Sequence, residues 1–390
     1  MNFDTLARYL DSLGEKYGLS GTDCCVMQDH KVLFRHMWGW SDHARTRPVC
    51  AQDLYNVYSC TKIITMTACM QLAEQGLIAL DDPVEKYIPE FASMMISDDC
   101  DMLCVPPRCP EQSDHQHPAS AKITLRHLMS MTAGLSYDIR SSAIREAIRS
   151  SGGTAGTVAI AAAIAKMPLM YEPGTRYFYS LGHDIMAAVV EIASGERYSD
   201  YLQKHIFNPL ELRNMHMHVP ECERGRLSAQ YICGDTDKIS ETDSGNPYRL
   251  TPNYDSGGAG LACTVDDYIR VLDALANGGA AFNGHRLLSR ESIDQMRTPQ
   301  LCRKAQEDFF RGIAKAGYSY GLGVRTLVDP GKSKSPAGEF GWDGAAGAYA
   351  LIDPENHLSV FYAQQVLNMR RAYGEIHPTL RDLVYECIRL

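Results

Sequence analysis

The sequence has no hydrophobic segment long enough to cross a lipid bilayer. Its longest apolar run, Thr157 to Met170, is interrupted by Lys166 and is shorter than the roughly 20 residues that a membrane helix needs. Residues 1–17 alternate apolar positions with charges and lack the continuous apolar core of a signal peptide. We therefore expect no membrane partner, and an amphipathic surface helix at the start of the chain.

The chain also lacks the excess of positive charge that nucleic-acid binding requires. Its 47 acidic residues outnumber its 38 lysines and arginines, which gives a net charge of −9. Because phosphates are bound mainly by basic side chains, we expect no nucleic-acid partner. Hydrophobic residues make up 45% of the chain and charged residues 22%, as in folded globular proteins. The length of 390 residues favours two or three domains, or one large domain with an insertion.

The 13 cysteines have none of the regular spacing that marks disulfide-rich secreted domains. An odd number without a framework favours buried, reduced thiols, and this predicts a cytoplasmic location. No H-E-x-x-H motif of a zinc protease is present either.

One segment, residues 98–119, looks inserted and holds side chains of the types that zinc prefers. These residues are Cys100, Cys104, Cys109, His115 and His117. Their spacing matches no standard zinc motif, so an ordinary surface loop is the favoured interpretation. We predict no metal and no organic cofactor.

Strand-like apolar runs lie near both ends of the chain, whereas the middle has a mainly helical pattern. The runs are Cys24–Met27, Val32–Trp38, Tyr318–Val328, Ala348–Ile352 and Leu358–Gln364. We predict an α/β (α+β) fold with one antiparallel sheet built from both chain ends and flanked by helices. Residues 1–80 and 301–390 then form the sheet domain, and residues 81–300 form an inserted, mainly helical domain. The active site is expected between the two.

Two serine motifs compete for a catalytic role. The stretch Gly317 to Gly321, with Ser319 at its centre, matches the G-x-S-x-G nucleophile elbow, which needs a strand before the serine and a helix after it. Here the β-rich pattern continues beyond Ser319 to Val328. Ser319 is therefore expected to be an ordinary strand residue.

The second motif is Ser59-Cys60-Thr61-Lys62, the one S-x-x-K of the chain. A helix that starts near Ser59 places its hydroxyl close to the positive end of the helix dipole. The same helix places Lys62 one turn later on the same face, so a nucleophile stands beside a base. A serine at a helix start is also a common N-cap and a helical lysine is usually solvated, so the motif needs support from elsewhere.

That support comes from a series of sequence blocks spread over most of the chain. They are YNVYSCTK (55–62), LDDPV (80–84), ITLRHLMSMTAGL (123–135), PGTRYFYSL (173–181), GGAGL (257–261) and GWDGAAG (341–347). In this order they resemble the serine β-lactamase and penicillin-binding-protein superfamily, above all its class C β-lactamase-like branch. Met131 and Ala133 depart from the H-T-S-G-L usual in that branch. The resemblance implies a β-lactamase-like sandwich fold.

The resemblance also implies a role for each matching residue. Ser59 is the acylated nucleophile and Lys62 its proton acceptor. Tyr179 stands where the second motif, Y-x-N or Y-S-x, carries the tyrosine that works with the lysine. Leu181 replaces the amide of Y-x-N at a substrate-binding position. If Tyr179 is a core residue instead, Tyr177 is the next candidate.

The third motif, Trp342-Asp343-Gly344, resembles the W-x-G form of family VIII carboxylesterases. By analogy, the backbone N–H groups of Ser59 and Ala345 form the oxyanion hole. Gly344 lets the substrate approach the strand. Trp342 is either a substrate contact or a half-buried strand aromatic. Relatives carry a lysine or histidine in this motif, whereas here an aromatic ring and the carboxylate of Asp343 occupy its first two positions, so we expect neutral or cationic esters to be preferred over anionic ones.

The implied function is that of a serine hydrolase, and neutral small esters are the favoured substrates. Alternatives within the superfamily are a β-lactamase, a D-amino peptidase, an amide hydrolase and an acyltransferase. A further alternative is a ligand-binding protein that kept the fold and lost turnover. The expected partner is a small-molecule ester or amide, and a homo-oligomer is compatible with the sequence.

Overall fold

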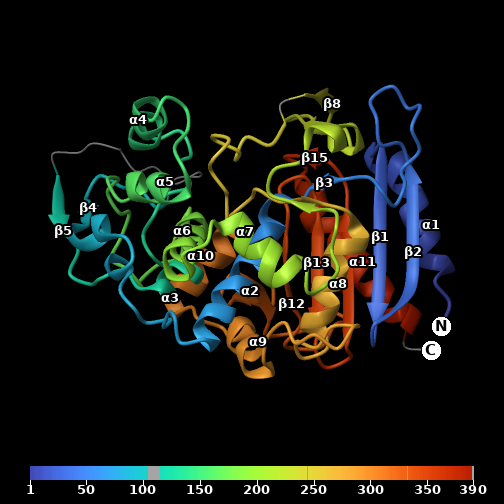
Figure 1. The fold of residues 1–390 in the computed structure, drawn as a ribbon. Coiled ribbons are helices and arrows are strands. Elements are labelled where there is room, and N and C mark those ends of the chain that lie inside the picture. Colours follow the sequence, from blue (N-terminus) through green and yellow to red (C-terminus); the bar gives the residue numbers. More distant parts are fainter. Residues whose placement is uncertain (104–114, 244, 332, 389–390) are drawn as a thin grey trace.

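A seven-stranded antiparallel sheet forms the centre of the fold in the computed structural model, which describes residues 1–103, 115–243, 245–331 and 333–388. Its strand order is β10-β11-β12-β13-β14-β1-β2. The strands are β1 (Gly21–Gln28), β2 (Lys31–Gly39), β10 (Tyr318–Tyr320), β11 (Arg325–Leu327), β12 (Phe340–Asp343), β13 (Tyr349–Asp353) and β14 (Leu358–Ala363). Strand β1 pairs with β14, with Cys24 opposite Tyr362, so the strands of this sheet that come first and last along the chain lie side by side (Figure 1). The antiparallel sheet predicted from both chain ends is confirmed.

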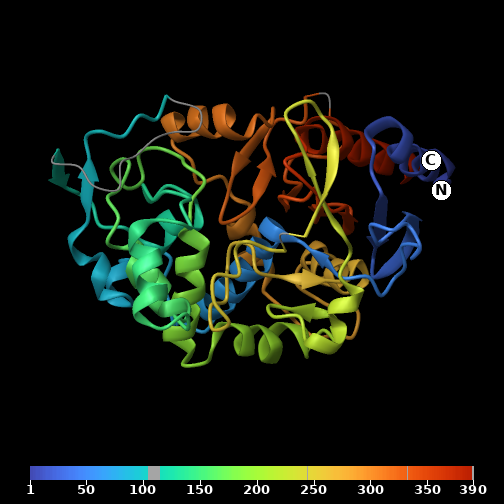
Figure 2. The ribbon, with the colours of Figure 1, turned by 90° about the horizontal axis from the view of Figure 1, so that it is seen from above.

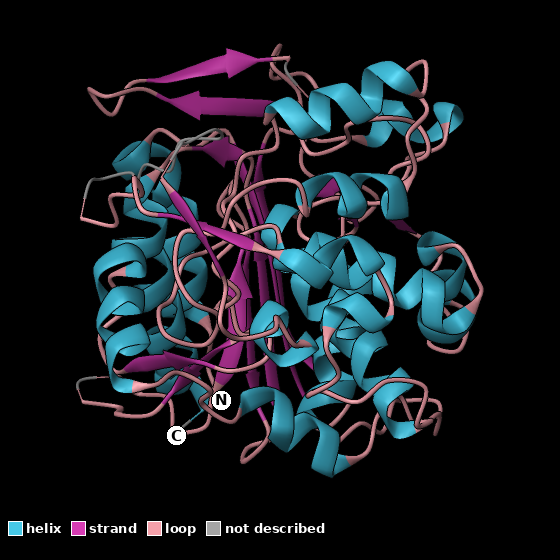
Figure 3. Cartoon of the chain, turned by 90° about the vertical axis from the view of Figure 1, so that its left-hand side faces the viewer, coloured by secondary structure: helices cyan, strands magenta, loops and turns pink. Residues whose placement is uncertain are grey.

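Helices cover both faces of this sheet, and its central strands are accordingly apolar on both sides. Every residue of β13 and β14 is buried. One set of alternate residues, including Val26 and Val360, packs against α1 (Asp4–Tyr17) and α11 (His377–Ile388). The other set, including Met27 and Phe361, joins the main core with α2 (Thr61–Glu74) and α8 (Val265–Ala276). Figure 3 shows the strands running between two groups of helices.

The middle of the chain is mainly helical and lies to one side of the sheet (Figure 2). Its further helices are α3 (Leu125–Met129), α4 (Ser142–Ser150), α5 (Thr157–Ile164), α6 (Gly182–Ser194), α7 (Tyr198–Leu202), α9 (Arg290–Arg297) and α10 (Arg303–Ile313). Its short strands are β4 (Met95–Ser97), β5 (Gln116–Pro118), β6 (Met215–His216), β7 (Gln230–Cys233), β8 (Ile239–Thr242) and β9 (Ala262–Cys263). Two short strands from outside this range pair with them: β3 (Tyr55–Asn56) with β9, and β15 (Val366–Leu367) with β7. Helix α8 belongs to the range 81–300 by sequence, yet it packs on β14, β1 and β13. Among the helices of the described residues, none has the length and hydrophobicity of a membrane span.

Helix α2 lies at the junction of the sheet and the helical half (Figure 1). All of its residues from Thr61 to Leu72 are buried. A helix that is buried on every side is one that other elements surround, and α2 contacts α6, α7, α9 and β12. The N-terminal end of this central helix is where the S-x-x-K motif begins.

Candidate active site

Ser59 lies in a 3₁₀ turn, Tyr58–Cys60, that leads directly into α2. The turn is tight because Tyr58 has a φ of 45°, in the left-handed region that is unfavourable for a residue with a large side chain. The Tyr58 ring is 1% exposed, and its hydroxyl donates a hydrogen bond to the side-chain oxygen of Gln230. Burial and this hydrogen bond hold the strained residue, and the turn brings the Ser59 hydroxyl to the edge of a cavity.

Lys62 is fully buried one helical turn after Ser59. Its Nζ lies 3.4 Å from Ser59 Oγ and donates a hydrogen bond of 2.7 Å to the carbonyl oxygen of Gly258. The same Nζ lies 4.7 Å from the ring centre of Tyr179 and 5.5 Å from that of Tyr137. Burial lowers the pKa of Lys62 from 10.5 to about 7, although the charge of Asp184 acts in the opposite direction. A large part of the lysine is therefore a neutral amine at neutral pH.

Tyr179 completes the contact around the serine. Its hydroxyl accepts a hydrogen bond of 3.0 Å from Trp342 Nε1, and it is near enough to the Ser59 side chain for that group to act on the pKa of Tyr179. The Trp342 and Tyr179 rings stack with their centres 5.6 Å apart. Burial raises the pKa of Tyr179 well above its usual value, so the hydroxyl keeps its proton at neutral pH. The structure thus brings together Ser59, Lys62 and Tyr179, the three side chains that the sequence singled out, and gives the Trp342 indole N–H a defined partner.

A buried carboxylate that the sequence analysis missed supports Lys62. Asp184, in the first turn of α6, is 3% exposed. Its Oδ1 accepts hydrogen bonds from the Tyr254 hydroxyl at 2.6 Å, the Ser256 hydroxyl at 2.6 Å and the Gly258 N–H at 3.3 Å. Asp184 therefore fixes the loop whose Gly258 carbonyl binds Lys62. A carboxylate within the apolar run of α6 was the available sequence signal.

Glycine is required at position 258 because the loop passes so close to these groups. A Cβ atom there would lie 2.5 Å from Asp184 Oδ2 and 3.3 Å from Lys62 Nζ. The second glycine of the G-G-A-G-L block that supported the resemblance is therefore explained by steric contact.

The third motif forms the end of β12 and the turn that follows it. A Cβ atom on Gly344 would lie 2.4 Å from the carbonyl oxygen of Val57, so the glycine allows close packing of β12 against the Ser59 turn. Gly344 also lines the cavity beside Ser59, so its expected role in substrate approach stays a prediction. In the described part of the chain, no acceptor bonds the N–H of Ala345. The Tyr373 hydroxyl donates to the carbonyls of Gly344 and Ala345 at 3.0 and 2.9 Å and orients this turn.

Asp343 does not present an unpaired charge to the site, and this corrects the expectation of a negative local field. Its Oδ2 lies 2.8 Å from Lys315 Nζ, and its Oδ1 lies 3.2 Å from Arg325 Nη1. Burial alone would raise the pKa of Asp343, but the charges of Lys315 and Arg325 lower it well below its usual range. The carboxylate is ionised and its charge is cancelled by two cations from other segments. The preference for neutral esters that was derived from Asp343 loses its physical basis.

A cavity of about 620 Å³ opens beside these groups. Aromatic side chains form much of its wall, and the polar end holds charged residues of α10 and the loop after it. It is lined by Ser59, Met102, Tyr137, Tyr177, Phe178, Tyr179, Tyr248, Asp308, Arg311, Gly312, Ile313, Lys315, Trp342, Asp343, Gly344, Ala345 and Tyr373. Leu181, expected at a substrate-binding position, lies outside this lining. It is 2% exposed and packs in the main core at the start of α6.

The competing serine lies in a setting that does not fit a nucleophile elbow. Ser319 is 4% exposed in β10 and pairs with Thr326 of β11. A second strand follows it where the elbow needs a helix, because the predicted strand Tyr318–Val328 is a hairpin.

The candidate zinc segment has other partners for its described residues. Cys100 is disulfide-bonded, so it offers no thiolate, and this corrects the expectation that the cysteines are all reduced. His117 Nδ1 lies 3.0 Å from Asp98 Oδ1 and His115 Nδ1 lies 3.3 Å from Asp99 Oδ1. Cys104 and Cys109 lie outside the described residues. Within the described residues, no cluster of three or more side chains is arranged to bind a metal.

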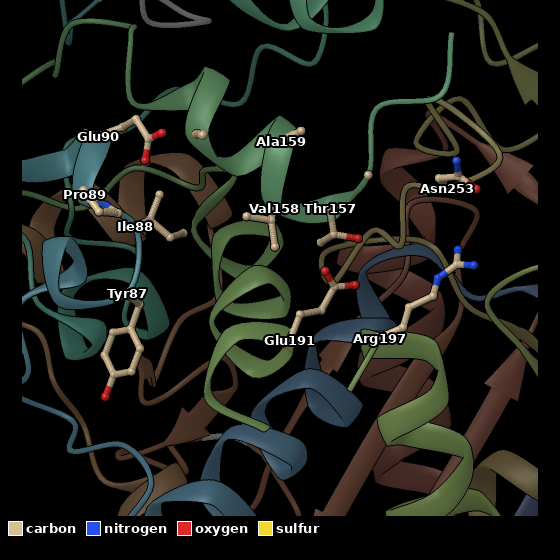
Figure 4. Close-up of a pocket in the computed structure, with 12 residues that line it drawn as sticks. Tyr87, Ile88, Pro89, Glu90, Thr157, Val158, Ala159, Glu191, Arg197 and Asn253 are labelled. Carbon is tan, nitrogen blue, oxygen red and sulfur yellow. The ribbon is translucent and has the colours of Figure 1, made fainter. Parts of the chain in front are cut away.

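A second cavity, of about 730 Å³, is lined by residues of the helical half (Figure 4). Glu191, Arg197 and Asn253 line one part of it, and Tyr87 and Ile88 line another. The Arg197 guanidinium binds the buried carboxylate of Asp255 through hydrogen bonds of 3.0 and 2.9 Å. The lining of this second cavity shares no residue with that of the cavity beside Ser59.

Comparisons with known proteins give matches over most of the chain. A sequence model of the Beta-lactamase family matches residues 6–377. The acyltransferase calJ of Penicillium decumbens is 29% identical over 346 residues, which cover 82% of this chain and 77% of calJ. Esterase EstB of Burkholderia gladioli is 27% identical over 404 residues, which cover 94% of this chain and 91% of EstB. The solved structure of EstCE1, a hydrolase with promiscuous acyltransferase activity, superposes with a TM-score of 0.77 at 22% identity and covers 98% of each chain.

Proposed function

Because this chain belongs to the Beta-lactamase family, we propose that it is a serine hydrolase that cleaves small carboxylic esters through an acyl-enzyme on Ser59. The observation that carries the proposal is the contact of Ser59 Oγ with both a buried amine, Lys62, and a buried phenol, Tyr179. The aromatic wall of the cavity favours an apolar acyl group. Esterase EstB, a relative over nearly the whole chain, adds support for ester substrates.

In the proposed mechanism, the neutral amine of Lys62 accepts the Ser59 proton as Oγ attacks the ester carbonyl carbon. Tyr179 keeps its own proton because burial raises its pKa, so it acts as a hydrogen-bond partner and relay rather than as the ground-state base. The N–H groups of Ser59 and Ala345 stabilise the negative charge on the tetrahedral intermediate. The alcohol then leaves with a proton returned from Lys62 through Tyr179, and water hydrolyses the acyl-enzyme.

The decisive experiment is to locate the acyl group. Wild-type protein treated with a fluorophosphonate or a slowly hydrolysed ester is expected to gain one adduct, which peptide mass spectrometry places on Ser59. Ser59→Ala is expected to lose the adduct and ester turnover, whereas Ser319→Ala, the matched control, keeps both. An adduct on Ser319, or ester turnover that survives in Ser59→Ala, would reject the proposal.

The pKa of Lys62 predicts the pH dependence of turnover. Catalysis needs the neutral amine, so kcat/KM for a neutral ester is expected to rise with pH along a limb with an apparent pKa of about 7. His183, the buried histidine next to Asp184, does not account for this limb because burial lowers its pKa to about 3. A pH profile measured from pH 5 to 9 tests this assignment. A flat profile over that range contradicts Lys62 as the base.

Acyl transfer to an alcohol instead of to water is the second candidate function. Two observations favour it: the relative calJ is an acyltransferase, and the cavity of about 620 Å³ has room for an acceptor beside the acyl group. Adding an alcohol acceptor to the ester assay and measuring the new ester distinguishes transfer from hydrolysis. A binding protein without turnover is the weaker alternative, because Ser59, Lys62 and Tyr179 remain in mutual contact.

A further inference from the structure

Four charged residues line the active-site cavity: Asp308, Arg311, Lys315 and Asp343. The first three lie on α10 or in the loop that follows it, and Asp343 lies at the end of β12. Two of these side chains are carboxylates and two are cations. The charge that a ligand meets therefore depends on which of them already form ion pairs with other protein groups.

Both carboxylates are engaged by protein donors. The Asp308 carboxylate accepts hydrogen bonds of 2.5 and 2.9 Å from the Arg176 guanidinium. The backbone N–H of Tyr177 adds a third, of 3.4 Å. Asp343 is held by Lys315 and Arg325 in the same way, at 2.8 and 3.2 Å. Neither group retains a full negative charge toward the cavity.

Arg311 forms an ion pair with Asp308, but this pair leaves an excess of positive charge. The Nη1 atom of Arg311 lies 3.6 Å from Asp308 Oδ1, beyond hydrogen-bond distance, and the single charge of Asp308 is shared with Arg176, which binds it through two hydrogen bonds. The Arg311 side chain is 44% exposed, whereas that of Lys315 is 12% exposed. Lys315 therefore lies deeper, next to the third motif, and Arg311 lies further out on the last turn of α10. A guanidinium has five N–H donors in a fork that matches a carboxylate.

We propose that the cavity binds esters that carry a carboxylate remote from the scissile carbonyl, and that Arg311 binds this carboxylate. The inference rests on the proposed ester hydrolysis and specifies its substrate class: an apolar body for the aromatic wall and an anionic group for Arg311. It also replaces the sequence-based expectation of a neutral substrate, because that expectation took Asp343 to be unpaired. The net charge of −9 does not draw anions to the protein as a whole, so recognition of an anionic substrate depends on local cations such as Arg311.

Matched pairs of nitrophenyl esters test the proposal. In each pair one acyl chain ends in a carboxylate and the other, of equal length, ends in a methyl group. For one or more chain lengths, wild-type kcat/KM at low salt is expected to be about tenfold higher for the carboxylate ester, and the preference is expected to shrink as salt screens the charge. Arg311→Gln is expected to reduce the ratio within such a pair to about one.

Arg303→Gln is the matched control, because Arg303 lies on the same helix with a side chain that is 96% exposed and outside the cavity lining. It is expected to keep the wild-type ratio. The proposal is overturned if wild type prefers the methyl ester at every chain length, or if Arg311→Gln leaves the ratio unchanged. If wild type hydrolyses neither ester, the proposed function itself fails, which is a separate outcome.

Discussion

Lys62→Met is expected to lower kcat/KM for esters by about 10³-fold, because it removes the amine that accepts the Ser59 proton. Methionine has a similar length and no charge, so the packing of α2 is expected to survive. The 3.4 Å contact with Ser59 and the 2.7 Å hydrogen bond to Gly258 are both lost.

The same variant is expected to be more stable than wild type near neutral pH. An unfolded lysine keeps its proton up to about pH 10.5, whereas Lys62 in the folded protein releases it near pH 7. Between these values the unfolded state binds more protons than the folded state, so the stability of the wild type rises with pH. The destabilisation caused by Lys62 is complete below about pH 7 and disappears above about pH 10.5. Lys62→Met has no such dependence, and its advantage is largest at pH 7 and below.

Urea unfolding of both proteins at pH 6, 7 and 9.5, together with ester turnover, checks the two effects. The difference between wild type and variant isolates the lysine from other groups that titrate. A variant that is less stable than wild type at pH 6 contradicts the view that Lys62 is held at a cost in stability for its reactivity.

Asp184→Ala is expected to cause the largest loss of stability among the site variants, about 3 kcal/mol. It removes the acceptor of three buried hydrogen bonds and leaves the donors of Tyr254, Ser256 and Gly258 without a partner. Turnover is expected to fall as well, because the Gly258 carbonyl no longer holds Lys62 in place.

Asp184→Asn separates charge from structure, since asparagine keeps one acceptor oxygen. Removing the charge that raises the pKa of Lys62 is expected to move the acidic limb of the pH profile to lower pH. Asp200→Ala, an exposed carboxylate on α7, is the control for the alanine change. Thermal and urea unfolding measure the stabilities. An alanine variant that loses less than about 1 kcal/mol, within the range of an ordinary surface change, would mean that water replaces the carboxylate.

The sequence was most informative where function depends on local spacing. Ser59 and Lys62 are three residues apart on one helix, so their proximity follows from helix geometry alone. The short apolar runs likewise predicted the sheet, because strands that are buried on both faces have nearly continuous apolar sequences. Tyr179 was found by its resemblance to a family motif rather than by any local pattern.

The sequence did not predict the features of the site that depend on contacts between residues far apart in the chain. Asp184 meets Tyr254 and Ser256 across about 70 residues of chain, and no local pattern reports such a contact. The charge at Asp343 was misjudged for the same reason, since Lys315 and Arg325 reach it from a loop and a neighbouring strand. A side chain's formal charge can be read from the sequence, but the field it exerts depends on partners that only the fold brings together.

The pairing of β1 with β14 has a consequence for how the protein is made. Synthesis proceeds from the N-terminus, so β1 and the nucleophile turn leave the ribosome well before β14, which pairs with β1, and the Gly344–Ala345 turn. Until those segments emerge, a nascent chain carries Ser59 without a completed sheet or an oxyanion hole. The hydroxyl becomes reactive only when the last strands dock, so incomplete chains are expected to be catalytically silent.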